Sequence, residues 1–151
     1  MDALLGEQTC PHADLDIAVP TRHFDRARAV LADHSFVVVR NDGQYSGVFG
    51  DDVGRLVDVH AFDDTFTLIG RDGIERHGPL GLAYEAGGFS GAGRIEGRPV
   101  RCMSAQFQMR SHTGYRVDDD DWHDVHYLHR RFGLPIPDGY EDWVDRPHEK
   151  A

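Results

Sequence analysis

The segment that most constrains the fold is residues 11–20, PHADLDIAVP, in which polar and apolar side chains alternate. The alternating positions are Asp14, Asp16 and Ala18 on one side and Leu15, Ile17 and Val19 on the other. This period of two predicts a β-strand over residues 14–19 that ends at Pro20. Since residues i and i+2 of a strand point the same way, about 6–7 Å apart, both carboxylates share one face while the apolar residues enter the core.

Two carboxylates this close repel each other, and their charged forms resist burial. A divalent cation between them removes the conflict, and Mg²⁺ suits one or two carboxylates together with substrate phosphates. The alternative is a solvated face on an edge strand, and the spacing of Asp14 and Asp16 alone does not decide between the two interpretations.

A third carboxylate lies in a similar setting. In RLVDVHAF (residues 55–62), Asp58 and His60 share one face of a predicted strand, and Val57, Val59 and Ala61 take the other. If this strand pairs beside the first, the three carboxylates Asp14, Asp16 and Asp58 converge. Two can hold a metal ion, and the third can complete the site or accept a proton from an attacking hydroxyl. A phosphohydrolase could use the same three groups.

The remaining pattern indicates a small mixed sheet with helices, which is the α+β class. A helix is expected over about 22–32, capped by Thr21, with Phe24, Ala27, Val30 and Leu31 as its apolar stripe. Strands are expected at 35–40 (SFVVVR, mostly apolar and therefore central), at 45–50 and at 55–62, with a short strand in FTLIG and a hairpin in GRIEGRPVRC that turns at Glu96–Gly97.

Helices are expected toward the C-terminus. Ser104 caps one that runs to about His112, and a second covers about 121–132, with Trp122, Val125, Leu128 and Phe132 as its stripe and Gly133 as its end. We expect one domain over 1–137 and a polar tail over 138–151, with Trp143 exposed. The spacing of His123, His126 and His129 does not favour a zinc site, and the run DDDD at 118–121 fits a helix N-terminus better than a calcium loop.

Composition and charge restrict the partners. The 151 residues carry 26 acidic and 16 basic side chains, a net charge of −10, which argues against a nucleic-acid partner and attracts small cationic molecules. No apolar run reaches the length of a membrane span, and MDALLGEQTC lacks the basic and apolar regions of a signal peptide. We therefore expect a cytoplasmic protein without a membrane partner.

Three segments together resemble a known family: DALLGEQTCPHADLDIAVP, then VDVHAF, then GRIEGRPVRCMSAQFQMRSHTGYRVDDDDWHDVHYLHRRFGLPIP. They are similar to the small antibiotic nucleotidyltransferases of the DNA polymerase β-like superfamily, in particular the lincosamide nucleotidyltransferases and the aminoglycoside 2''-adenylyltransferases. The similarity covers roughly residues 2–137. D-x-D alone is a weak motif, whereas D-x-D with VDVH and GRPVRC in this order is fairly specific.

The resemblance implies a nucleotidyltransferase fold, a small mixed sheet flanked by helices with a helical C-terminal portion. It implies transfer of a nucleoside monophosphate, usually AMP from ATP, to a hydroxyl of a drug such as a lincosamide or aminoglycoside. Asp14 and Asp16 match the metal-binding pair, and Asp58 matches the third carboxylate, the general base. His60, His112 and Tyr115 are then expected to line the substrate site, Mg²⁺ is the expected cofactor, and a homodimer with the drug near the shared surface is expected.

One departure concerns the phosphate loop. The family carries a glycine pair on a turn before the helix that leads to D-x-D, and the backbone there approaches the triphosphate. Here the sequence starts at MDALLG, inside that helix by the resemblance, and Gly6 lies too late. We therefore expect weakened triphosphate binding, and a non-catalytic binding or regulatory module that kept the fold is the alternative function.

Overall fold

The computed structural model describes residues 1–144, which fold into two compact units. The first, here called the carboxylate unit, comprises residues 12–86. The second, here called the helical unit, comprises residues 1–11 and the chain from Gly87 onward. The domain expected over 1–137 includes residues of both units. Among the described residues no helix has the length and apolar character of a membrane span.

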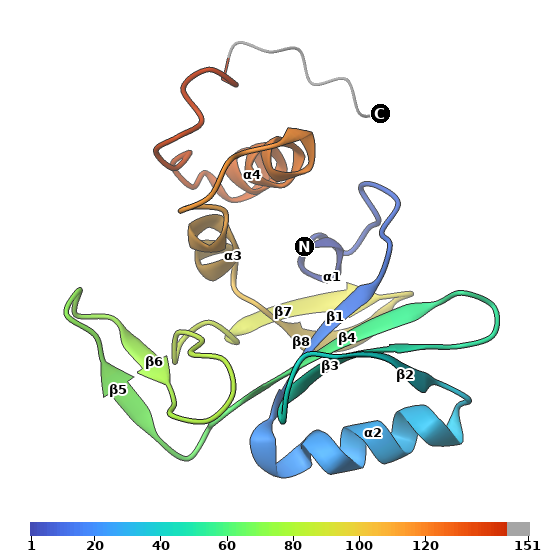
Figure 1. Cartoon of the computed structure of the whole chain (residues 1–151). Helices are drawn as coiled ribbons and strands as arrows, with labels where there is room; N and C mark the ends of the chain where they lie inside the picture. The colour runs from blue at the N-terminus through green and yellow to red at the C-terminus, as the bar shows by residue number, and fades with distance from the viewer. Residues whose placement is uncertain (145–151) are drawn as a thin grey trace. The chain divides into compact units, whose positions relative to one another are not determined.

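A four-stranded mixed sheet forms the centre of the carboxylate unit (Figure 1). Its strands, in spatial order, are β1 (Leu15–Pro20), β4 (Leu56–Phe62), β3 (Ser46–Gly50) and β2 (Val37–Asn41). β1 and β4 run parallel, and the other neighbours run antiparallel. A parallel pair needs a long crossover, which here contains the 3₁₀ turn η1 (Thr21–His23), the helix α2 (Phe24–Asp33) and the β2–β3 hairpin.

The core of this unit lies between α2 and one face of the sheet (Figure 1). Its buried residues are Phe24, Phe49, Val57, Val59 and Ala61. The three residues from β4 are the apolar half of the alternation in RLVDVHAF, so the sequence pattern predicted this face correctly. A two-stranded sheet, β5 (Thr67–Ile69) with β6 (Glu75–His77), completes the unit; the sequence predicted β5 but not its partner.

Several predictions for this unit were wrong. β2 is an edge strand rather than a central one, and Val37, Val38 and Val39 are exposed by 50–65%. Strand order depends on pairing between distant segments, so a run of valines does not determine it. Leu15 and Val30 are also about half exposed, and Thr21 begins a 3₁₀ turn without a side-chain capping bond, so the α-helix starts at Phe24.

The helical unit contains a short helix, a hairpin and two longer helices. These are α1 (Asp2–Leu5), β7 (Gly91–Ile95) paired with β8 (Arg98–Cys102), α3 (Ala105–Ser111) and α4 (Asp119–Phe132). The backbone of α1 lies so close to β7 that a Cβ at Gly93 would stand 1.9 Å from the carbonyl oxygen of Ala3. Only glycine fits at this position, so the close packing of α1 against β7 explains why residue 93 of the GGFSGAG segment is glycine.

The helix caps predicted for the helical unit are confirmed. The Ser104 hydroxyl accepts a hydrogen bond from the N–H of Phe107. Asp118 and Asp121 form a reciprocal capping box, so α4 starts two residues earlier than expected, and Gly133 ends it in the left-handed conformation. Trp122, Val125 and Leu128 are buried as predicted, whereas Phe132 is 41% exposed.

The polar segment after Pro137 contributes to the core, contrary to expectation. Tyr140 is only 1% exposed and belongs to the same cluster as Trp122 and Leu128, and Trp143 packs against that cluster rather than standing free in solvent. The Tyr140 hydroxyl donates a hydrogen bond of 3.0 Å to the carbonyl oxygen of His112. The remainder of the expected tail, residues 145–151, lies outside the described residues.

We predict that Tyr140→Ala lowers the free energy of unfolding by about 3–5 kcal/mol, the range for truncating a large buried aromatic residue. The matched control is Asp142→Ala, two residues further along on the exposed surface, with an expected change within about 0.5 kcal/mol. Urea denaturation followed by tryptophan fluorescence measures both. Equal stability of the two variants would contradict the role of Tyr140 in the core.

Candidate active site

The candidate site is built by the parallel pairing of β1 with β4. The register sets Asp16 directly opposite Asp58, and His60 opposite Ala18. Directly paired residues of neighbouring strands point to the same face of a sheet, so the convergence of Asp16 and Asp58 expected from the sequence is confirmed. This face is opposite to the one that carries Val57 and Val59.

Asp16, Asp58 and His60 form the one group of potential metal ligands detected among the described residues. One ligand atom from each lies within 4.8 Å of the other two. His60 Nε2 is 3.4 Å from Asp58 Oδ1 and 3.6 Å from Asp16 Oδ1. The imidazole therefore lies near both carboxylates rather than beside one of them.

Asp58 is the most enclosed member of this group. Its side chain is 10% exposed, and Oδ2 accepts a hydrogen bond of 3.2 Å from Arg40 Nη2, whose Nε also contacts Asp42. Oδ1 is buried and has no hydrogen-bond partner in the described structure. A buried carboxylate oxygen without a donor is costly, and a cation at this oxygen would remove that cost.

Asp14 differs from its expected position. It precedes the first paired residue of β1, is exposed, and does not belong to the group of three. Its charge still acts on the site. Asp16 is itself exposed, with 70% of its side chain accessible. Partial desolvation and then repulsion from Asp14 raise the pKa of Asp16 above its usual value, with a smaller contribution from Asp58, while His60 acts in the opposite direction. Asp16 and Asp58 thus lie opposite each other on neighbouring strands, whereas Asp14 lies just before the first residue of β1.

Tyr84 is a nearby residue that sequence reasoning missed. Burial, and then the negative charges of Asp16 and Asp58, raise the pKa of its phenol to about 12. It lies in an irregular glycine-rich segment without periodicity, so no local pattern marks it. The hydroxyl stays protonated at neutral pH and can donate a hydrogen bond at this face of the sheet.

His112 and Tyr115, the other expected substrate residues, belong to the helical unit. They lie together at the start of α4, where the Tyr115 hydroxyl donates to Asp121 Oδ1 at 2.8 Å and His112 Nδ1 is 3.3 Å from the same oxygen. His112 Nε2 lies 3.7 Å from Asp124. This network links the end of α3 to the start of α4, and its part in substrate binding stays a prediction.

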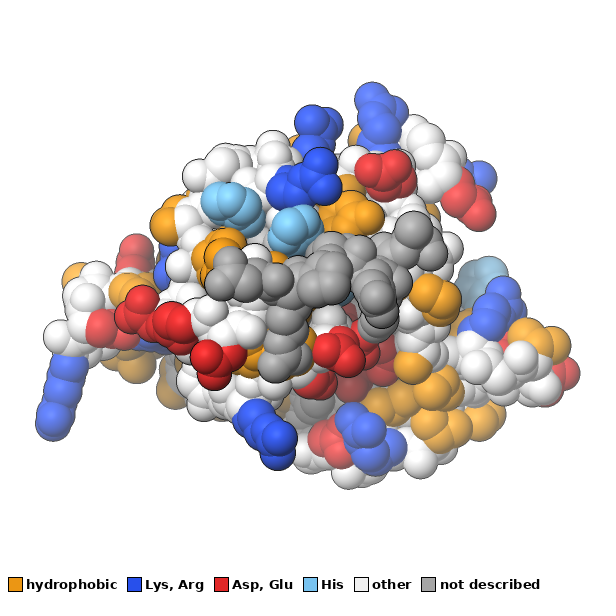
Figure 2. Space-filling model, turned by 90° about the horizontal axis from the view of Figure 1, so that it is seen from above, with side chains coloured by type: hydrophobic (Ala, Val, Ile, Leu, Met, Phe, Trp, Pro, Cys, Tyr) orange, Lys and Arg blue, Asp and Glu red, His pale blue; other side chains and the backbone are white. Residues whose placement is uncertain are grey.

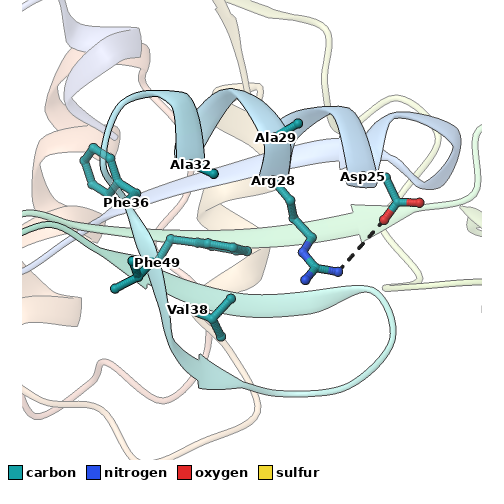
Figure 3. Close-up of a pocket in the computed structure, with 8 residues that line it drawn as sticks. Asp25, Arg28, Ala29, Ala32, Phe36, Val38 and Phe49 are labelled. Atoms are coloured by element: carbon teal, nitrogen blue, oxygen red, sulfur yellow. Dashed lines mark ion pairs between the residues drawn. The ribbon is translucent and has the colours of Figure 1, made fainter.

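A cavity of the carboxylate unit lies on the other face of the sheet. It has a volume of about 380 Å³ and lies between α2 and strands β2 and β3 (Figure 3). Phe36, Val38 and Phe49 form its apolar wall, and Arg28 reaches toward Asp25 at its rim. Since Phe49 pairs with Val57 and not with Asp58, the cavity faces away from the carboxylates and is a different place from the candidate active site.

We predict that Asp16→Asn slightly raises the stability of the metal-free protein at neutral pH, because the amide removes a charge that desolvation and Asp14 disfavour. The gain should be small, since the side chain is 70% exposed and water screens its charge. A carboxyl with a raised native pKa opposes folding once it ionises, so the gain should shrink as the pH falls toward the ordinary value of 3.8 and vanish below it. Urea denaturation across this range in the presence of a chelator measures the effect.

The control for this measurement is Asp52→Asn, an exposed aspartate on a turn of the same unit. It should leave the stability almost unchanged at every pH. A loss of stability in Asp16→Asn at neutral pH would show that attraction to His60 outweighs burial and repulsion, and so would contradict the electrostatic description of the site.

Comparison with known proteins adds to this geometry. The chain resembles the crystal structure of lincomycin-bound lincosamide antibiotic adenylyltransferase LnuA, with a TM-score of 0.65 and 20% identity over 84% of this chain and 78% of that one. It also resembles the solution structure of the antibiotic-resistance factor ANT(2'')-Ia, with a TM-score of 0.50 and 20% identity over 93% of this chain and 64% of that one. No curated protein sequence matched.

At these identities the structural matches establish the fold, which is the expected α+β nucleotidyltransferase fold. Family membership comes from the sequence. The family model described as aminoglycoside-2''-adenylyltransferase matches residues 1–128, most of the chain. The chain therefore belongs to the aminoglycoside-2''-adenylyltransferase family of antibiotic nucleotidyltransferases.

Proposed function

We propose that this nucleotidyltransferase moves AMP from ATP to a hydroxyl of a small cationic antibiotic, an aminoglycoside or a lincosamide, with the help of a divalent metal ion. The observation that carries the proposal is the register of β1 and β4, which sets Asp16 opposite Asp58 on the face away from the core. Family membership supplies the reaction class.

The residues present fit a metal ion. Asp58 offers a buried oxygen without a hydrogen-bond partner in the described structure, and Asp16 faces it from the next strand. Mg²⁺ would be held by Asp16 and Asp58. Asp14, just before β1, would add negative charge near the ion. When bound, the ion would neutralise phosphate charge and align the triphosphate for in-line displacement.

Asp58 is the proposed general base. The acceptor's hydroxyl oxygen attacks the α-phosphorus, the bond from that phosphorus to the bridging oxygen breaks, and pyrophosphate leaves. The hydroxyl proton passes to the carboxylate of Asp58. Oδ2 accepts one hydrogen bond from Arg40, and each carboxylate oxygen has two lone pairs. Asp58 can therefore contact the metal through Oδ1 and still take the proton on Oδ2. Tyr84, with its protonated hydroxyl, can donate to the acceptor or to a phosphate oxygen.

The surface charge supports a cationic acceptor. The net charge is −10, and Figure 2 shows several separate groups of acidic side chains on the face it draws, with basic side chains among them. Such a field attracts polyamine-like drugs from a distance. His112 and Tyr115 are proposed acceptor contacts, as the resemblance implies. His60, the third residue that the resemblance implies, lies beside Asp16 and Asp58. We also propose a homodimer, which sedimentation of the purified chain would test.

The direct test incubates the purified chain with ATP, Mg²⁺ and a panel of aminoglycosides and lincosamides. We expect release of pyrophosphate and a gain in acceptor mass equal to one AMP. Modification of no acceptor under these conditions would support the alternative, a non-catalytic binding or regulatory module. Phosphate release from simple esters without an acceptor would instead indicate a phosphohydrolase.

We predict that Asp58→Asn lowers turnover by about 10²–10⁴-fold, the range for losing a general acid–base group. The amide keeps the shape of the carboxyl, so circular dichroism should remain that of the native protein. Asp33→Asn, at the exposed end of α2, is the matched control and should keep native turnover. Native turnover in Asp58→Asn would overturn its assignment as the base.

A further inference from the structure

His60 is a second polar side chain of β4 on the carboxylate face, two residues after Asp58. Its direct neighbour on β1 is Ala18, whose small side chain leaves room for the imidazole beside the strand. The Nε2 atom of the ring lies 3.6 Å from Asp16 Oδ1 and 3.4 Å from Asp58 Oδ1. His60 therefore reaches both carboxylates that face each other across the strands.

The other ring nitrogen has its own partner on the next strand. Ser46 pairs with His60 in the β3–β4 register, and its hydroxyl oxygen lies 3.2 Å from Nδ1. When Nδ1–H donates to this oxygen, Nε2 carries the lone pair and directs it at the carboxylates. A histidine that binds a metal almost always donates its other N–H to such a partner, which fixes the ring.

The distances from Nε2 to the two carboxylate oxygens are close to those between ligands of one metal ion. Two ligand atoms that are each about 2.1 Å from a metal stand about 3.0 Å apart at 90° and about 3.4 Å apart at a tetrahedral angle. The 3.4 Å contact from Nε2 to Asp58 equals the tetrahedral value, and the 3.6 Å contact to Asp16 is 0.2 Å longer than it. The buried Oδ1 of Asp58, which no donor satisfies in the described structure, points to the same place.

We infer that His60 binds the divalent metal ion through Nε2, beside Asp16 and Asp58, and that Ser46 holds the imidazole in the tautomer this requires. The inference deepens the proposed function by adding a nitrogen to an oxygen ligand set. Carboxylates and water suit both Mg²⁺ and Mn²⁺, but Mn²⁺ is a first-row transition metal and accepts an imidazole nitrogen more readily than Mg²⁺ does. The site should therefore bind Mn²⁺ more tightly than Mg²⁺.

The test uses Mn²⁺ together with a non-hydrolysable ATP analogue on the whole chain. Electron spin echo modulation detects nitrogen bound to Mn²⁺, and labelling the protein with ¹⁵N-histidine separates imidazole nitrogen from that of the nucleotide. We expect an imidazole signal that changes with the label and disappears in His60→Gln. The control is His34→Gln, an exposed histidine just after α2, which should keep the signal.

Ser46→Ala provides a second variant that leaves the imidazole in place. Loss of an outer partner of a metal-bound histidine typically weakens metal binding by 10–100-fold, so we expect Mn²⁺ affinity to fall by about that factor, while Mg²⁺ loses less. Equilibrium titration of free Mn²⁺ by its paramagnetic signal gives the affinity without any measurement of turnover.

The outcomes separate this inference from the proposed function. Bound Mn²⁺ without an imidazole signal, or a signal that persists in His60→Gln, overturns the role of His60 and leaves the carboxylate site intact. Absence of bound Mn²⁺ overturns both the ligand assignment and the metal-dependent mechanism. Antibiotic modification is measured separately, so an enzyme that transfers AMP without an imidazole signal would refute the inference alone.

Discussion

The parallel pairing of β1 with β4 is the interaction on which the rest of the carboxylate unit depends. Its register joins two segments that are far apart in sequence and sets Asp16 opposite Asp58. Because a strand alternates its faces, a slip of one residue would turn every carboxylate toward the core and every valine toward solvent. The buried side chains of β4 therefore fix the register, and the fixed register positions the polar ones.

The same pairing brings like charges together, and the neighbouring strands compensate for this. Arg40 reaches Asp58 from β2, and His60 lies beside both carboxylates, held by Ser46 from β3. Each strand of the sheet thus contributes one part of the electrostatic arrangement. An arrangement with a raised pKa at Asp16 and an unsatisfied oxygen on Asp58 is less stable than an apolar face would be, as is common where function requires it.

The local part of this structure could be predicted from the sequence, and the non-local part could not. Alternation predicted which side chains of β1 and β4 face the core, because the pleat fixes this residue by residue, and Ser104 and Gly133 marked helix ends through their own chemistry. The edge position of Val37–Val39 and the burial of Tyr140 depend on which distant segments pack together. Tyr84 lacks a periodic context altogether, and its place beside the carboxylates follows from the tertiary fold alone.

The position of the ligand atoms on two strands has a consequence for folding. Asp16 and Asp58 meet only after the intervening helix and hairpin have formed, so an unfolded chain offers no comparable site. An ion that binds only the folded form shifts the folding equilibrium toward that form as its concentration rises. A bound metal would then stabilise the paired strands as well as supply chemistry, and divalent cations would raise the free energy of unfolding of the carboxylate unit.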